Sequence, residues 1–260
     1  VPVEDEEISK ELEKQYKKNG IGIMTSSEVT AIDTSGNGVK AKVKTATGEV
    51  ELEADVLLSA VGVSANIEGI GLEELGIKTD KGRIMVDKYG QSNVPGIYAI
   101  GDCSPGQALA HVASKEGIVC VEAIAYNEKK YHHQPEAIDY NNIPGCTYCV
   151  PEIASVGYTE KQAKDAGYDI KVGKFPLTAS GKASAAGHTE GFIKVIFDAK
   201  YGEWLGTHMI GYNVTELIAE TVTARKLETT YHEVLNAIHP HPTISESIKD
   251  AIEAVSYTHL

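Results

Sequence analysis

Two histidines and one glutamate near the C-terminal end have the types and spacing needed for proton transfer. The sequence around them reads His239-Pro-His241-Pro-Thr-Ile-Ser-Glu246. Pro242 fits the first position of a helix, where a missing N–H costs nothing, so His241 precedes that helix and Glu246 lies about one turn inside it. A carboxylate there can reach back to the imidazole, fix its tautomer and favour its protonated form, although the helix dipole opposes a cation. The pattern indicates a general base.

A second interpretation of the same histidines stays open at this point. His239 and His241 can simply cap and pack against the helix that follows them, and the pattern alone does not decide between packing and catalysis.

An aspartate at the end of an apolar run is a candidate for binding hydroxyl groups. The run Ile97-Tyr98-Ala99-Ile100 ends in Gly101-Asp102 and is followed by a helical pattern. Open α/β sheets bind ligands at the carboxyl edge of their strands, where such a carboxylate can accept hydrogen bonds from ribose or ribityl hydroxyls. The alternative is an ordinary turn aspartate.

Cys146 and Cys149 have the C-x-x-C spacing of a redox dithiol or of half a zinc site. A redox pair usually begins a helix, whereas this one lies in a proline-flanked segment before a predicted strand. Zinc would need two more ligands, and His132 and His133 are at the wrong spacing. We therefore interpret both cysteines as reduced and structural, and we expect no metal site. Four cysteines in 260 residues fit a reducing compartment, so we expect a cytoplasmic protein.

Composition excludes several other classes. Lys and Arg total 24 against 37 Asp and Glu, so the formal charge is −13, and a nucleic-acid binder would need a basic face. The apolar runs are far shorter than the ~18–20 residues of a membrane span. Apolar residues make up 42% and charged residues 23%, which is typical of a packed globular protein.

Hydrophobic periodicity predicts the elements that position these groups. A helix is expected at 6–19, a β-meander with strands at 39–43 and 50–54, a buried central strand at 56–62, a strand at 97–102, a helix at 109–126 and a linker at 127–139. Beyond the linker we expect strands at 153–156, 170–175, 191–197 and 204–210, and helices at 159–166, 214–225, 231–237 and 243–255. This order indicates an α/β part followed by an α+β domain.

Several tracts together resemble the flavoprotein disulfide reductases. They are residues 92–102, Leu109-Ala110-His111 with Glu116-Gly117, residues 151–160 and residues 211–220. The H-x-H-P-T-x-S-E form most resembles the branch of that family that oxidises dihydrolipoamide. The resemblance extends to about Ala254, and the tail 256–260 matches no part of it.

The resemblance implies a fold and a set of site residues. It implies the end of an NAD-binding domain with a β-meander at 1–58, the returning part of an FAD-binding domain at 59–128, and an α+β interface domain for dimerisation at 129–260. His241 would be the acid/base, oriented by Glu246 and acting at the flavin site of a second copy. Asp102 would hold the ribityl chain of FAD, and the other cofactor-binding positions would be Gly62, Gly101, Leu109, Ala110 and His111. Where the family often has G-R-x-P-N, this chain reads Gly62-Val63-Ser64-Ala65-Asn66.

The resemblance also implies cofactors and partners. Electrons would pass from a dithiol through an enzyme disulfide to FAD and then to NAD in a homodimer. The substrate would be carried by the lipoyl domain of a 2-oxo acid dehydrogenase or glycine cleavage complex. Neither G-x-G-x-x-G nor the family's C-x-x-x-x-C occurs in this sequence. We therefore expect a C-terminal half that retains neither cofactor tightly and is inactive alone.

Two alternatives remain. One is a glutathione reductase-like enzyme, although that branch usually has one histidine before Pro-Thr. The other is a non-catalytic dimerisation module.

Overall fold

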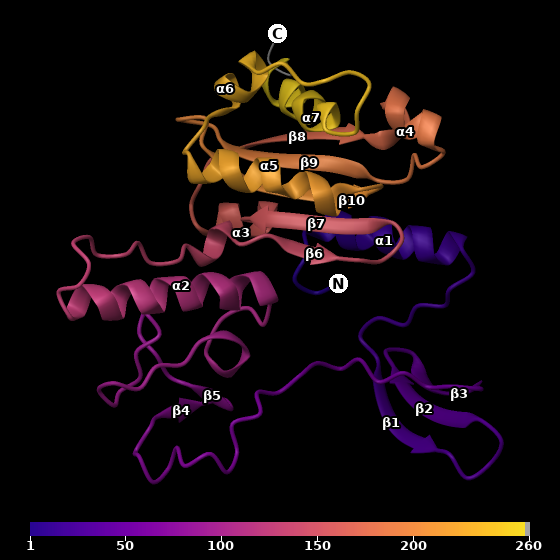
Figure 1. Ribbon diagram of the computed structural model, residues 1–260. Coiled ribbons are helices and arrows are strands. Elements are labelled where there is room, and N and C mark those ends of the chain that lie inside the picture. The colour runs from indigo at the N-terminus through magenta and orange to yellow at the C-terminus, as the bar shows by residue number, and fades with distance from the viewer. Residues whose placement is uncertain (258–260) are drawn as a thin grey trace. The chain divides into compact units, whose positions relative to one another are not determined.

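The computed structural model describes residues 1–257, and residues 258–260 of the unmatched tail lie outside this range. The chain divides into two compact units (Figure 1). One consists of Val1–Leu57 with Asn141–Leu260, and the other is Leu58–Tyr140. The division into three domains stays a prediction.

A five-stranded antiparallel sheet is the centre of the larger unit, in the order β6-β7-β10-β9-β8. Its strands are β6 (Gly145–Thr147), β7 (Glu152–Gly157), β8 (Ile170–Pro176), β9 (Phe192–Asp198) and β10 (Trp204–Gly211). The four longer strands confirm the prediction, whereas the short edge strand β6 was missed. The inner strands β9 and β10 are buried along their whole lengths, because side chains cover both faces of the sheet.

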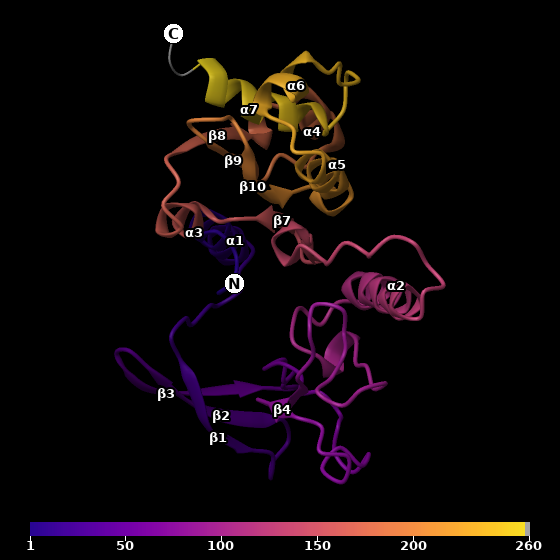
Figure 2. The ribbon, with the colours of Figure 1, turned by 90° about the vertical axis from the view of Figure 1, so that its left-hand side faces the viewer.

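Helices cover one face of this sheet (Figure 2). The helices on this face are α4 (Gly181–Ala186), α5 (Val214–Lys226), α6 (Tyr231–Asn236) and α7 (Glu246–Tyr257). The short helix α3 (Glu160–Asp165) lies on the other face, where its Ala163 packs with Ile196 and Leu205. α7 packs on β8 and β9, and α5 packs on β7 and β10. Alternate side chains of β9, namely Ile193, Val195 and Phe197, enter the core on this side. A Cβ at Gly173 would lie 2.0 Å from the carbonyl oxygen of Ala251, so the glycine allows α7 to approach β8 closely.

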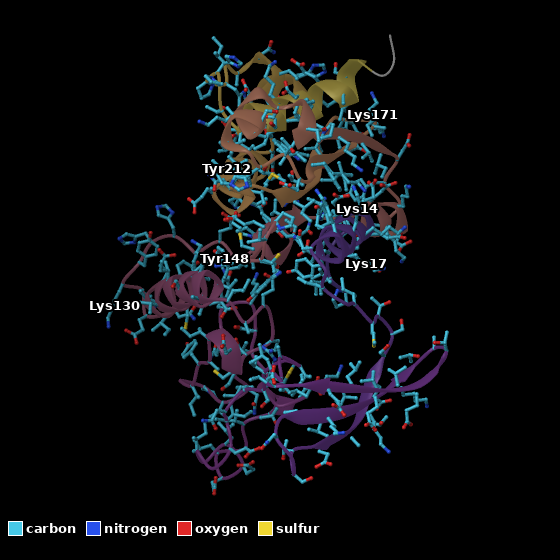
Figure 3. All side chains as sticks on the ribbon, turned by 90° about the vertical axis from the view of Figure 1, so that its right-hand side faces the viewer. Lys14, Lys17, Lys130, Tyr148, Lys171 and Tyr212 are labelled. Carbon is cyan, nitrogen blue, oxygen red and sulfur yellow. The ribbon has the colours of Figure 1, made fainter. Side chains whose placement is uncertain are left out.

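The helix α1 (Glu6–Lys18) lies on the opposite face, against β10. Its apolar side is anchored by Ile8, which is fully buried in a cluster with Ile153, Phe192 and Ile210. Its charged side carries Lys14 and Lys17, which are exposed (Figure 3). The amphipathic helix predicted at 6–19 is confirmed.

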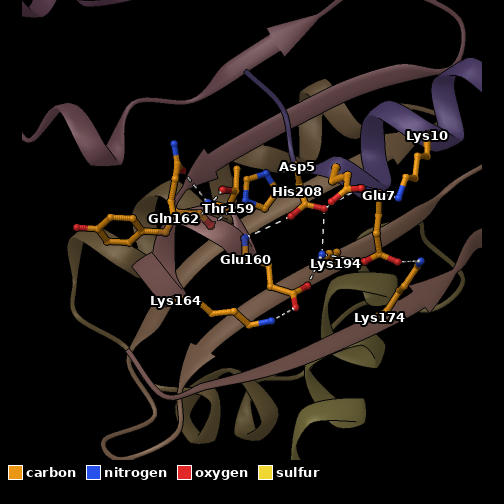
Figure 4. A network of polar contacts seen from close by, with 12 residues as sticks. Asp5, Glu7, Lys10, Thr159, Glu160, Gln162, Lys164, Lys174, Lys194 and His208 are labelled. Carbon is orange, nitrogen blue, oxygen red and sulfur yellow. Dashed lines mark hydrogen bonds and ion pairs between the residues drawn. The ribbon is translucent and has the colours of Figure 1, made fainter. Parts of the chain in front are cut away.

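A buried lysine joins this helix to the sheet (Figure 4). The ammonium of Lys194, with 1% of its side chain exposed, lies 2.8 to 2.9 Å from carboxylate oxygens of Asp5, Glu7 and Glu160. Burial alone would lower the pKa of Lys194, but its hydrogen bonds to these carboxylates outweigh that effect and raise the pKa. Asp5 also accepts a hydrogen bond from the backbone N–H of Glu7 and so caps α1. The cluster therefore ties the start of α1 to β9 and α3.

The two predicted strands at 39–43 and 50–54 are confirmed as neighbours in a β-meander, whereas the strand at 28–33 was missed. The meander consists of β1 (Glu28–Asp33), β2 (Val39–Thr45) and β3 (Gly48–Ala54), paired in that order and antiparallel. Gly38 at the first turn has φ +97°, and a Cβ there would lie 2.7 Å from the carbonyl oxygen of Ala54. The turn therefore requires glycine. Among its strand residues only Ala41 and Val43 are buried, so this sheet has little core of its own.

The smaller unit has little regular structure. Its elements are β4 (Thr79–Asp80), β5 (Arg83–Ile84), the 3-10 turn η1 (Gly101–Cys103) and the helix α2 (Ala110–Asn127). A further 3-10 turn, η2 (Tyr140–Asn142), follows at its end. α2 confirms the helix predicted at 109–126, and the predicted linker at 127–139 contains no strand and only the last residue of that helix. Among residues 1–257, no helix is both long and apolar enough to cross a bilayer.

Two predicted strands are wrong. The run 56–62 is irregular, and Val56, Leu58 and Val61 are 81%, 87% and 96% exposed. The run 97–102 forms only one isolated bridge, between Tyr98 and Gln91. A strand is stable only when neighbouring strands satisfy its backbone groups and cover its side chains. Within the described residues, the run 56–62 pairs with no strand. The run 97–102 has only a short neighbour, since Ser92 donates its N–H to Ile97 and Ala99 donates its N–H to Gly90.

Candidate functional site

The loop between α6 and α7 presents the predicted histidine and glutamate to each other. Nδ1 of His241 lies 2.9 Å from Oε2 of Glu246. The His241 side chain is 78% exposed, whereas that of Glu246 is 20% exposed. When Nδ1–H donates to this carboxylate, the lone pair of Nε2 is available to a molecule outside the loop. The geometry therefore provides an exposed proton acceptor held by a half-buried carboxylate.

Thr243 and Glu246 shape the start of the following helix. The backbone N–H of Thr243 donates to Oε1 of Glu246, and the N–H of Glu246 donates to Oγ1 of Thr243, both at 3.3 Å. This reciprocal arrangement resembles a capping box and fixes the glutamate carboxylate beside the loop. The predicted helix start at Thr243 is wrong, because α7 begins at Glu246. Pro242 therefore lies in the loop and not in the first helical turn.

The other histidine of the pattern has its own carboxylate. Nε2 of His239 lies 2.7 Å from Oε1 of Glu220 on α5, and the His239 side chain is only 9% exposed. Sequence reasoning missed Glu220, because 19 residues separate it from His239 and no local spacing links them. Packing of this histidine was one of the two interpretations left open, and for His239 it is the one the structure supports.

The predicted ribityl-binding aspartate lies on a well-anchored turn of the smaller unit. Gly101 has φ +71°, a conformation that favours glycine, and Asp102 next to it is exposed. The backbone N–H of Gly101 donates to Oε2 of the buried Glu116 at 2.6 Å. The hydroxyl of Tyr140 donates to Oε1 of the same carboxylate at 2.7 Å. Burial and then this hydrogen bond raise the pKa of Tyr140 to about 12.

The start of α2 lies beside this turn. Leu109 is its N-cap residue but provides no side-chain hydrogen bond, and Ala110 and His111 begin the helix. A Cβ at Gly101 would lie 3.2 Å from Cβ of Ala113, so turn and helix are in close contact. The structure thus brings together Gly101, Asp102 and the residues 109–111. Gly62 is exposed, and a Cβ built on it would have open space around it.

The two cysteines of the C-x-x-C pair lie in and just after the edge strand β6. Cys146 lies in β6 and not at the start of a helix, and burial raises its pKa. The thiol of Cys149 donates to the carbonyl oxygen of Pro151. Within residues 1–257, no group of three or more His, Cys, Asp or Glu side chains has an arrangement that holds a metal ion.

Two sequence profiles of one family match most of the chain. The profile described as pyridine nucleotide-disulphide oxidoreductase matches residues 1–117, and that of the family's dimerisation domain matches residues 143–252. The chain belongs to the pyridine nucleotide-disulphide oxidoreductases. This confirms the resemblance and the mixed α/β class. Members of this oxidoreductase family use flavin and nicotinamide cofactors in general.

Curated relatives of this oxidoreductase chain are dihydrolipoyl dehydrogenases. That of Rhizobium etli is 50% identical over 253 residues, which are 97% of this chain and 52% of the relative. That of Zymomonas mobilis is 46% identical, over 98% of this chain and 54% of the relative. The mitochondrial one of Pisum sativum is 40% identical, over 98% and 50%. The chain spans about half the length of these relatives.

Solved structures have the same fold. The Cu(II) complex of the HOCl-induced flavoprotein disulfide reductase RclA from Escherichia coli matches with a TM-score of 0.87 at 25% identity, over 98% of this chain and 56% of that chain. LpdA from Mycobacterium tuberculosis matches with a TM-score of 0.85 at 24% identity, over 97% and 53%. At that identity, the second likeness shows the fold alone.

Proposed function

We propose that this chain supplies the substrate-facing half of a dihydrolipoyl dehydrogenase, also called dihydrolipoamide dehydrogenase. The exposed His241–Glu246 pair carries the proposal, because oxidation of a dithiol needs a base that can be reached from outside. The dihydrolipoyl dehydrogenases that match at up to 50% identity along nearly the whole chain support it.

His241 acts on the proton of the substrate thiol. A thiol is a poor nucleophile until it is deprotonated, and Nε2 of His241 is the ring atom left for that proton. Glu246 accepts the hydrogen bond from Nδ1–H, which keeps the lone pair on Nε2 and stabilises the imidazolium that forms. Glu246 is therefore an orienting residue, and its amide isostere would keep much of the geometry.

The turn around Asp102 fits one part of a flavin. Its exposed carboxylate can accept hydrogen bonds from ribityl hydroxyls, and the start of α2 lies close beside it. When bound, FAD and NAD supply the electron chemistry, accepting electrons that leave the dithiol through a disulfide. Because this sequence contains no glycine-rich phosphate loop, we expect the isolated chain to be colourless after gel filtration. Stoichiometric retained flavin would contradict this.

The same proposal includes partners. We propose a homodimer in which the C-terminal part of one copy carries His241 to the flavin site of the other, and the match to a dimerisation domain supports this. We further propose that a lipoyl domain of a 2-oxo acid dehydrogenase or glycine cleavage complex delivers the dithiol. The four free cysteines support a reducing compartment, and we propose the cytoplasm. Light scattering that finds a dilution-stable monomer near 27.9 kDa would argue against the dimer.

A hybrid enzyme tests the activity. We define it as this chain joined to the N-terminal half of the Rhizobium etli relative. Loss of general-base catalysis should lower kcat for dihydrolipoamide and NAD by about 10²–10⁴-fold in His241→Gln, with a smaller loss in Glu246→Gln. His132→Gln, an exposed histidine in the irregular segment after α2, is the matched control and should keep the parent rate.

Two outcomes would count against the assignment. If His239→Gln were more harmful than His241→Gln, the base would be His239. If the hybrid enzyme reduced glutathione disulfide and did not oxidise dihydrolipoamide, the glutathione reductase-like alternative would replace the proposal.

A further inference from the structure

A histidine of the loop between α6 and α7 forms a second histidine–carboxylate pair, with a carboxylate of α5, and its geometry differs from that of the first (Figure 1 shows α6 and α7 in yellow). His241 uses Nδ1 toward Glu246 and leaves Nε2 on the outside. His239 uses Nε2 toward Glu220, and its Nδ1 is buried with no hydrogen-bond partner among the described residues. His239 therefore has no ring atom available to an external molecule, so its role differs from that of a base.

The His239–Glu220 bond is the main side-chain anchor on the N-terminal side of this loop. Ala237, Ile238 and Pro240 are exposed, with Ile238 at 98%, whereas the His239 side chain is only 9% exposed. Its partner Glu220 lies on α5, which packs on β7 and β10. The bond therefore connects the loop directly to a helix that is fixed on the sheet.

The C-terminal side of the loop has an anchor of its own and is also bonded to the N-terminal side. The hydroxyl of Thr243 donates to the carbonyl oxygen of Pro240 at 2.7 Å, and the side chain of Ile244 is buried in the core under α7. His241 lies between these two anchors, and its own side chain is 78% exposed. Since the exposed ring contributes little packing, the position of His241 depends on its neighbours.

We infer that Glu220 and His239 are positioning residues for His241. Glu220 holds His239, and His239 holds the backbone that presents the His241 ring to Glu246. The expected effect on the reaction rate rests on the proposed function. The dependence of the position of His241 on Glu220 and His239 does not, because it is a property of this chain. A displacement of about 1 Å in a catalytic group can cost about 10²-fold in rate. For an anchor at one end of the loop we expect roughly a tenfold fall in kcat with little change in KM.

A third titratable group, Asp250 on α7, interacts with His239, so its surroundings must stay the same in all variants. Asp250 on α7 interacts electrostatically with His239; burial raises the pKa of Asp250, and a charge on His239 would lower it. Glu246, Lys249 and Glu253 also act on Asp250. Measurements at one pH, on variants that leave these α7 residues unchanged, therefore isolate the effect of Glu220.

The decisive experiment reads the tautomer of His241 directly. Ring ¹⁵N NMR of this chain distinguishes a neutral histidine protonated at Nδ1 from one protonated at Nε2. In the parent we expect the Nδ1–H form at His241, because Nδ1 donates to Glu246. Glu220→Ala should shift His241 toward the mixture of tautomers seen for a free imidazole, although Glu220 does not touch it. Glu216→Ala, an exposed carboxylate one turn earlier on α5, is the matched control and should leave the His241 signals unchanged.

Conservative variants separate positioning from a general loss of structure. His239→Gln keeps an N–H donor for Glu220 and should retain most of the parent tautomer and rate, whereas His239→Leu removes the donor and should behave like Glu220→Ala. If Glu220→Ala fails to fold, Glu220→Gln, which keeps a weaker acceptor, should give an intermediate shift. Unchanged His241 signals in Glu220→Ala, or equal effects of His239→Gln and His239→Leu, would overturn the inference.

The two proposals can fail independently. If the hybrid enzyme with His241→Gln keeps its activity, the proposed function is wrong, while the tautomer measurement still decides whether Glu220 positions His241. If the tautomer does not respond to Glu220, the positioning inference is wrong, and His241 can still be the base.

Discussion

The C-terminal sheet is regular and well buried, whereas the segment 58–140 has little regular structure. The sheet is antiparallel throughout, its five strands follow one another within 67 residues of chain from Gly145 to Gly211, and two of its inner strands, β9 and β10, are buried along their whole lengths. The segment 58–140 contains apolar runs of similar character, yet its strands are two residues long and Val61 is 96% exposed. Antiparallel strands can pair through short local connections. A central strand of a parallel sheet, in contrast, depends on neighbouring strands from distant parts of the sequence. Apolar content alone therefore does not make a strand.

The largest expected effect is a core deletion in the C-terminal sheet. Phe197 is fully buried, and its ring centroid lies 5.2 Å from that of Trp204, the only tryptophan. Phe197→Ala should lower the free energy of unfolding by about 3–5 kcal/mol, because it removes buried apolar surface and leaves a cavity. Urea denaturation followed by tryptophan fluorescence measures it. A loss below about 1 kcal/mol would mean that this core is loosely packed.

Removal of the buried lysine should destabilise the same unit through charge. Lys194→Met leaves the carboxylates of Asp5, Glu7 and Glu160 without their shared cation. We expect the free energy of unfolding to fall by about 3 kcal/mol near neutral pH. This value is at the low end for buried ion pairs, because two of the three carboxylates are partly exposed. Burial would raise the pKa of Asp5, but the Lys194 ammonium holds it below 3.8. The parent therefore has this stabilisation above the unfolded-state pKa of 3.8 and loses it as pH falls through the lower folded value.

Urea denaturation at several pH values checks this sign. The difference between parent and Lys194→Met should shrink as the pH is lowered, because protonated carboxylates no longer need a cation. A difference that stays constant or grows toward low pH would contradict the assigned charges.

A smaller effect is expected at the anchor of the Asp102 turn. Tyr140→Phe removes the hydroxyl that donates to Glu116, with an expected cost of about 1.5 kcal/mol to the segment 58–140. The phenol of Tyr140 should titrate near its raised pKa of about 12, so this stabilisation is present below 10.0 and is lost as pH rises through about 12. An ultraviolet difference titration between the parent and Tyr140→Phe reads that value. In Glu116→Gln the titration should move toward 10.0, and an unmoved titration would show that Glu116 is not the cause.

The smallest effect is expected at an exposed apolar residue. Val61→Ser should change the stability of this chain by less than about 0.5 kcal/mol, because the side chain is 96% exposed. In the hybrid enzyme, where added strands can cover this segment, the same substitution should cost clearly more. Equal small effects in both proteins would mean that the segment stays uncovered in the longer protein as well.

The sequence predicted elements whose stability is local. The period of Ile8 and Leu12 in α1, and the alternation of Val39, Ala41 and Val43 in β2, identify a helix and a strand whose backbone hydrogen bonds are made close in sequence. The apolar side of α1, in contrast, packs against distant strands. The contact between His241 and Glu246 was predictable for the same reason, since they are only five positions apart in the sequence. The predicted helix start failed by three residues, because Thr243 and Glu246 close a turn before the helix begins.

Tertiary structure alone decided the contacts that join distant segments. Glu220 meets His239 across 19 residues, Lys194 meets Asp5 across 189, and Gly101 meets Glu116 because α2 folds back on the turn. The runs 56–62 and 97–102 read as strands because periodicity reports apolar content and not the presence of a neighbour. The sequence by itself determined the local elements, the acidic charge, the resemblance and the candidate base. Which carboxylate holds which histidine, and which apolar run becomes a strand, depends on segments brought together only by packing.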